Sequence, residues 1–120
     1  MTTYAIAHLR ELTMGPEIVE YLKRIDATLA PYGGRFLVHG ADVHTLEGEW
    51  PGDIVIIAFP DRDRATRWYE SDPYQAILPL RTENSDSVAI LVDGVGEDHR
   101  STDLLTGTEA TAAPAPAEQI

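Results

Sequence analysis

Two short segments of this chain are apolar at every position, so the fold must bury both of their faces. The run Ile54–Phe59 reads Ile-Val-Ile-Ile-Ala-Phe, and Val88–Val92 reads Val-Ala-Ile-Leu-Val. Both runs are short and rich in β-branched residues, which predicts two strands. A strand with one solvated face alternates apolar and polar residues. The sheet that contains these two strands is therefore expected to be covered on both sides.

Two further strands are predicted from shorter apolar segments. They lie at Tyr4–Leu9 and at Arg35–His39, where the chain reads Arg-Phe-Leu-Val-His. The segment Val43–Gly48 is an expected continuation of the second of these strands, after a bulge at Gly40.

Two helical regions separate the strands. The first is predicted between Pro16 and the Gly33-Gly34 pair, because apolar residues recur there at helical spacing. These residues are Ile18, Leu22, Ile25 and Leu29. The second begins at the helix-capping Asp61 and is interrupted at Ser71-Asp72-Pro73, where a further helical turn is expected.

The resulting order β-α-β-β-α-β predicts an α+β fold of the ferredoxin-like type, with helices on one face of a four-stranded antiparallel sheet. The other face then needs a cover. A second copy of the same sheet is the simplest one, and it predicts a homodimer with two-fold symmetry. The length of 120 residues suits one domain, expected over residues 1–96. Residues 97–120, rich in Ala, Pro and Thr towards their end, are expected to form a flexible tail.

Composition narrows the possible partners. The chain carries 9 basic and 20 acidic residues, a net charge of −11. Nucleic acids and anionic membranes are bound through clustered Lys and Arg, so neither is an expected partner. Cysteine is absent, which excludes disulfides and thiolate chemistry from this sequence. With no signal peptide or membrane-spanning segment expected, the predicted location is the cytoplasm.

A family resemblance adds to this interpretation. It is carried by Tyr32–Val38, Leu46-Glu47-Gly48, Phe59-Pro60, Trp68–Ile77 and Arg81. In these stretches the chain resembles the family called domain of unknown function 1330 (DUF1330), which belongs to the dimeric α+β barrel superfamily. The resemblance covers roughly residues 4–95 and implies the same dimer. It implies no particular reaction, because enzymes and ligand-binding modules share this fold.

The chain departs from the family pattern at two places. Ala58 stands before Phe59-Pro60, where the family commonly has Glu. His39-Gly40-Ala41 stands where the family commonly has Arg-Gly-Gly. Any role of that Glu or Arg is performed differently here or is absent.

Three residues are candidates for catalysis: His8, His39 and Arg35. An imidazole titrates near neutral pH and can move a proton, whereas a guanidinium can hold a carboxylate or an enolate oxygen. Each also has a structural interpretation, as a hydrogen-bonded strand residue or as an ion-pair partner. Strand alternation places His8 on the same face as Tyr4 and Ile6. A hairpin register that sets Arg35 opposite Ala58 is one alternative.

A cavity between the sheet and the helices is expected to bind a small molecule. Its candidate binding residues are mostly aromatic: Trp68, Tyr69, Tyr74, Arg81, Trp50 and Tyr32. Core packing explains Trp68 and Tyr69 equally well. No metal site is expected, since His39 and His44 have no further ligand at a standard spacing. No cofactor is expected either.

Two functions remain open. The first is a cofactor-independent enzyme, of the cyclase, isomerase or monooxygenase type, that acts by proton transfer on an apolar, aromatic or polyketide-like molecule. The second is a non-catalytic dimeric module that binds a small molecule or assists a partner. The contents of the cavity decide between them.

Overall fold

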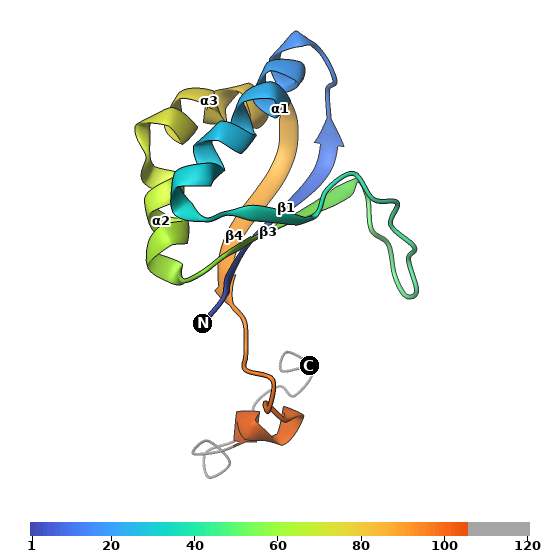
Figure 1. The fold of residues 1–120 in the computed structure, drawn as a ribbon. Helices are drawn as coiled ribbons and strands as arrows, with labels where there is room; N and C mark the ends of the chain where they lie inside the picture. Colours follow the sequence, from blue (N-terminus) through green and yellow to red (C-terminus); the bar gives the residue numbers. More distant parts are fainter. Residues whose placement is uncertain (106–120) are drawn as a thin grey trace.

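The computed structural model describes residues 1–105 as one layer of helices on one layer of sheet (Figure 1). The elements are β1 (Thr3–Leu12), α1 (Pro16–Leu29), η1 (Ala30–Tyr32), β2 (Arg35–Val38), β3 (Asp53–Phe59), α2 (Arg62–Glu70), α3 (Asp72–Thr82), β4 (Ser85–Asp93) and η2 (Ser101–Leu105). The predicted ferredoxin-like α+β fold is confirmed.

The sheet is antiparallel throughout and has the strand order β2-β3-β1-β4. In the centre, Ile6 of β1 lies opposite Ile56 of β3 and Ile90 of β4. At the edge, Arg35 lies opposite Ala58, so the proposed hairpin register is correct. This register sorts the strand residues into two faces, one towards the helices and one away from them.

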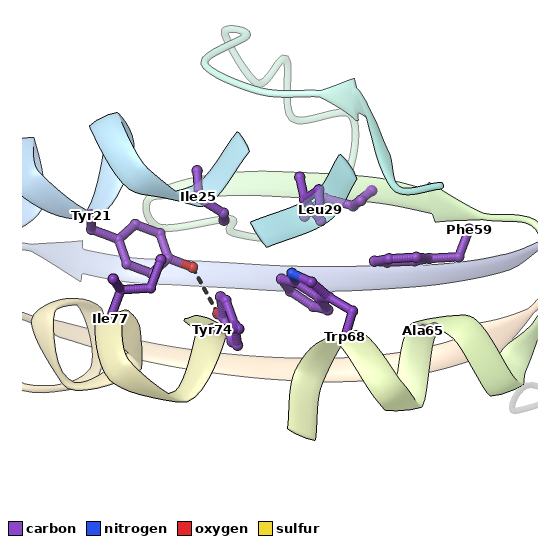
Figure 2. Packing of buried hydrophobic residues seen from close by; sticks show 9 residues of the cluster. Tyr21, Ile25, Leu29, Phe59, Ala65, Trp68, Tyr74 and Ile77 are labelled. Carbon is purple, nitrogen blue, oxygen red and sulfur yellow. Dashed lines mark hydrogen bonds between the residues drawn. The ribbon is translucent and has the colours of Figure 1, made fainter. Parts of the chain in front are cut away.

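The core lies between the sheet and the helices (Figure 2). Its buried members are Tyr21, Ile25, Leu29, Ile57, Phe59, Ala65, Trp68, Tyr74 and Ile77. A chain of hydrogen bonds joins α2 to α1, because Trp68 Nε1 donates to Thr28 Oγ1 (3.0 Å) and Thr28 Oγ1 donates to the Ile25 carbonyl (2.7 Å). These bonds satisfy polar atoms that would otherwise be buried without partners.

Side-chain caps define the boundaries of α2 and α3, and the cap at Asp61 was expected. The Asp61 carboxylate accepts from the Arg64 backbone N–H (2.8 Å). Ser71 ends α2 and caps α3, where its hydroxyl accepts from the Tyr74 backbone N–H (3.3 Å). After η1, Gly34 approaches β3 so closely that a Cβ there would lie 2.7 Å from the Phe59 ring. A side chain at this position would therefore displace the core.

Three details differ from the sequence-based expectations. The predicted strand at 43–48 is wrong, because the chain between β2 and β3 is an exposed loop, with left-handed φ at Gly40, Gly48 and Gly52. Helix α3 is a full helix of 11 residues rather than one turn. In α1, Tyr21 faces the core in place of Leu22, which is 41% exposed.

The structure describes only part of the expected tail, residues 97–120. Residues 97–105 are exposed and include η2, whereas 106–120 lie outside the described residues. The proposed domain boundary near residue 96 therefore stays a prediction. None of the helices within residues 1–105 is long and apolar enough to span a membrane.

Candidate functional site

A cavity of about 470 Å³ lies between the helix-facing side of the sheet and the layer formed by α1, α2 and α3. It is partly open to solvent, and the exposed side chains of Met14, Leu22 and Tyr69 are among its lining residues. Its volume is in the range of small-molecule sites, and its wall is mainly apolar.

Small residues on two adjacent strands form part of the floor of the cavity. Ala7 of β1 lies opposite Ala89 of β4, and Ala5 is the next residue of β1 on the same face. A methyl group rises little above the sheet, so these three alanines leave space where larger side chains would fill the layer. The small side chains at these three positions thus contribute to the space of the cavity.

Aromatic rings form much of the wall. The Trp68 and Tyr74 rings lie 4.1 Å apart between centroids, and Tyr69 packs 5.6 Å from Tyr74. From the β2 side, Phe36 lines the cavity with its ring stacked on the imidazole of His39 at 4.4 Å. Such flat, polarisable surfaces suit a planar apolar ligand.

The buried polar part of the cavity is formed by two phenols and one guanidinium. The hydroxyl oxygens of Tyr21 and Tyr74 are 2.7 Å apart and share a hydrogen bond (Figure 2). Arg81, only 7% exposed, donates from Nη1 to Ser87 Oγ (2.7 Å). Within residues 1–105, Arg81 forms no ion pair with a carboxylate.

The surroundings shift the pKa values of Tyr21 and Arg81. Burial, and then the neighbouring Tyr74, raises the pKa of Tyr21 well above its ordinary value, against an opposing effect of Arg81. Burial alone would lower the pKa of Arg81, but its interactions with the Tyr74 and Tyr21 phenols outweigh burial and raise it. The cavity therefore contains the neutral Tyr21 phenol beside a permanent cation, Arg81.

The structure separates the candidate residues into two groups. His39, Trp68, Tyr69, Tyr74 and Arg81 all line the cavity. The other candidates, His8, Arg35, Trp50 and Tyr32, do not line it.

His8 and Arg35 lie on the sheet face that points away from the helices. His8 shares this face with Tyr4 and Ile6, as the alternation predicted, and its Nε2 donates to the carbonyl of Pro51 (2.7 Å). Its ring stacks on Trp50 with centroids 3.9 Å apart. His8 thus anchors the β2–β3 loop to the sheet and faces away from the cavity.

The last candidate, Tyr32, has a packing role. Tyr32 packs against the edge of the core from η1. In the described part of the chain, no group of three or more His, Asp or Glu side chains is placed to hold a metal ion.

Several cavity residues were missed by the sequence analysis, among them Tyr21, Ala5, Ala7 and Ala89. The alanines carried a usable signal, since all three occupy alternate positions of predicted strands, where large apolar residues are the norm. The signal at Tyr21 was weaker. Tyr21 and Leu22 both fit the helical spacing between Ile18 and Ile25, so the spacing alone does not show which of the two faces the core.

The family comparison covers most of the chain. The model of the family described as domain of unknown function (DUF1330) matches residues 2–95. The chain belongs to the DUF1330 family. No curated protein matches this DUF1330 chain.

Solved structures share the fold of this DUF1330 protein at low sequence identity. A dimeric ferredoxin-like protein of unknown function from Jannaschia sp. CCS1 has 11% identity and a TM-score of 0.59, with 78% of this chain and 100% of that chain covered. Another dimeric ferredoxin-like protein of unknown function, from Thermobifida fusca YX, has 20% identity and a TM-score of 0.54, covering 78% and 92%. SnoaB, a cofactor-independent oxygenase from Streptomyces nogalater, has 15% identity and a TM-score of 0.50, covering 82% and 96%.

Proposed function

We propose that the cavity binds an apolar, aromatic or polyketide-like small molecule and that the protein acts on it by proton transfer without a cofactor. The observation that carries this proposal is the hollow between sheet and helices, with aromatic walls and one buried cation, Arg81. A fold stabilised only by packing has few voids larger than a water molecule. A space of about 470 Å³ held open by alanines suits a ligand better than a packing defect.

The proposed chemistry uses residues at different parts of the wall. His39, at the end of β2, reaches the cavity from the solvent-exposed side and would remove a proton from a carbon next to a carbonyl group. The electron pair left on the substrate then moves to the carbonyl oxygen, and Arg81 would stabilise the resulting enolate. The aromatic rings would exclude water from the reacting atoms.

A second copy of the chain is the proposed partner. The sheet face away from the helices exposes apolar side chains, which include Val88, Ile90 and Val92 at 41–53% exposure. Ile90 lies opposite Ile6, which in turn lies opposite Ile56. A contiguous apolar face of this kind indicates an interface. Two structures of similar fold are dimeric, which supports a homodimer formed sheet to sheet.

The test of catalysis is hydrogen exchange into an enolisable apolar ketone. 2-Tetralone would be incubated with the protein in heavy water, and loss of its α-proton signals would be followed by NMR. Proton removal by His39 and return of a deuteron from solvent should give exchange above the buffer rate. His39→Gln, which retains a polar side chain without a base, should reduce it at least 10-fold. His8→Gln, on the other sheet face, is the matched control and should exchange like the parent.

The two possible failures have different meanings. If 2-tetralone binds but exchanges at the buffer rate, the protein is a non-catalytic binding module and the enzyme proposal is wrong. If neither 2-tetralone nor other bicyclic aromatic compounds bind, the cavity is not a site for molecules of this class.

A further inference from the structure

The polar part of the cavity has one hydroxyl proton more than its own hydrogen bonds use. Tyr21 and Tyr74 have two hydroxyl protons, and the bond between their oxygens, at 2.7 Å, uses only one of them. Arg81 has donors alone, so it cannot accept the other. The second hydroxyl proton is donated to no other group within residues 1–105. Whichever phenol donates to its neighbour, the neighbour keeps a proton that it can donate to a ligand.

Arg81 is held in place beside this pair. Its Nη1 donates to Ser87 Oγ (2.7 Å), and Ser87 in turn lies 3.0 Å from Ser85 Oγ. Ser85 also donates to the Arg81 backbone carbonyl (2.6 Å). A guanidinium has five N–H donors, and within residues 1–105 this one donates to the neutral Ser87 hydroxyl and interacts with the phenols of Tyr21 and Tyr74. A buried cation without an anionic partner is energetically costly unless a ligand supplies the charge.

We infer that Arg81 and the Tyr21–Tyr74 hydroxyl pair form an oxyanion-binding site. Its ligand is an apolar ring system that carries one anionic oxygen group: a carboxylate, a phenolate or an enolate. The guanidinium supplies the charge and the spare phenol proton supplies a second hydrogen bond, an arrangement that stabilises developing negative charge in enzymes. This inference rests on the proposed function, since it assigns the ligand class of the same cavity.

The surroundings favour a ligand with a single negative charge. Asp53 and Glu70 also line the cavity, and both are exposed. Their carboxylates would repel a second anionic group on the ligand, and so would the overall charge of −11. Nucleotides and other phosphate-rich molecules are therefore poor candidates, whereas monoanionic aromatic acids and enols suit the site.

The test compares 2-naphthoate with its neutral isostere 2-naphthamide by isothermal titration calorimetry. The parent should bind naphthoate at least 10-fold more tightly than naphthamide. In Arg81→Met this preference should disappear through loss of naphthoate affinity, with naphthamide affinity unchanged. Tyr21→Phe and Tyr74→Phe should each weaken naphthoate binding about 3–10-fold and naphthamide binding less. Arg35→Met removes an arginine from the other sheet face and should change neither affinity.

A measurement on the parent protein covers the case in which Arg81→Met fails to fold. The carboxyl carbon of 13C-labelled 2-naphthoate reports its own ionisation by NMR, and binding beside Arg81 should lower its pKa by at least one unit. A bound pKa that is unchanged or raised would overturn the oxyanion site, and so would an Arg81→Met variant that retains the naphthoate preference. In both cases binding itself persists, so the proposed cavity function survives. Failure of both probes to bind the parent would instead contradict that proposed function.

Discussion

Replacing Ala7 by Leu tests whether the cavity is built for a ligand or is an accident of packing. Ala7 is part of the cavity floor, where it lies opposite Ala89 and Val55. Leucine adds three carbon atoms that point from the floor towards the aromatic wall. Ala76→Leu is the matched control, since Ala76 lies on an exposed position of α3 and does not line the cavity.

The magnitude follows from the burial of the added carbons. A fully buried methylene group contributes about 0.8 kcal/mol, so three would stabilise the fold by up to about 2.4 kcal/mol. Ala7 is only partly buried, and we expect about half of this, roughly 1 kcal/mol, or about 4–8 °C in melting temperature. The added side chain should at the same time obstruct a planar ligand on the floor and weaken 2-naphthoate binding at least 10-fold.

Thermal denaturation and calorimetric titration of both variants provide the assay. Ala7→Leu should raise the melting temperature and weaken 2-naphthoate binding. Ala76→Leu should change neither quantity. A loss of stability above about 2 kcal/mol would mean that the layer at Ala7 is already filled, as overpacked cores are destabilised by this amount. Unchanged naphthoate affinity in a stable Ala7→Leu variant would refute the assignment of the ligand to this floor.

Three further predictions concern stability and assembly. Thr28→Val leaves the Trp68 indole N–H without its acceptor and should cost about 2 kcal/mol in urea denaturation, more than Thr28→Ser, which keeps the hydroxyl. Ile90→Lys should convert a dimer into a folded monomer in sedimentation experiments, whereas Val19→Lys on the outer side of α1 should leave the dimer intact. The pKa of Asp93 is lowered, chiefly by the hydrogen bond from Thr3. Its stabilisation is therefore present above the ordinary value of 3.8 and lost as pH falls through the lower folded-state pKa, so the deficit of Asp93→Asn should disappear at low pH.

The fold was predictable because its patterns are local. The apolar runs, the helical stripe and the capping residues Asp61 and Ser71 each define one element, and the order of elements defines the topology. The loop between β2 and β3 was harder to predict from the sequence. Val43 and Leu46 resemble strand residues, yet glycines with left-handed φ interrupt the extended backbone at Gly40 and Gly48.

The site was predictable only in part, for a physical reason. Alternation placed His8 with Tyr4 and Ile6, but it did not indicate which sheet face carries the helices. Both faces of β3 are apolar, with Ile54 and Ile56 on one side and Val55 and Ile57 on the other, so hydrophobicity does not distinguish them. Side-chain size does distinguish them, since the three floor alanines, Ala5, Ala7 and Ala89, lie on the helix-facing side.

The central claim is that an apolar ligand occupies the space above these alanines, and alanine methyl groups report this directly. Protein labelled with 13C at alanine methyls would be titrated with 2-naphthoate and followed by NMR, with Ala58 on the other sheet face as an internal control. We predict large shifts and ligand-to-methyl Overhauser effects at Ala5, Ala7 and Ala89, and none at Ala58. Effects confined to Ala58, or absent from the three floor methyls at saturation, would contradict the account.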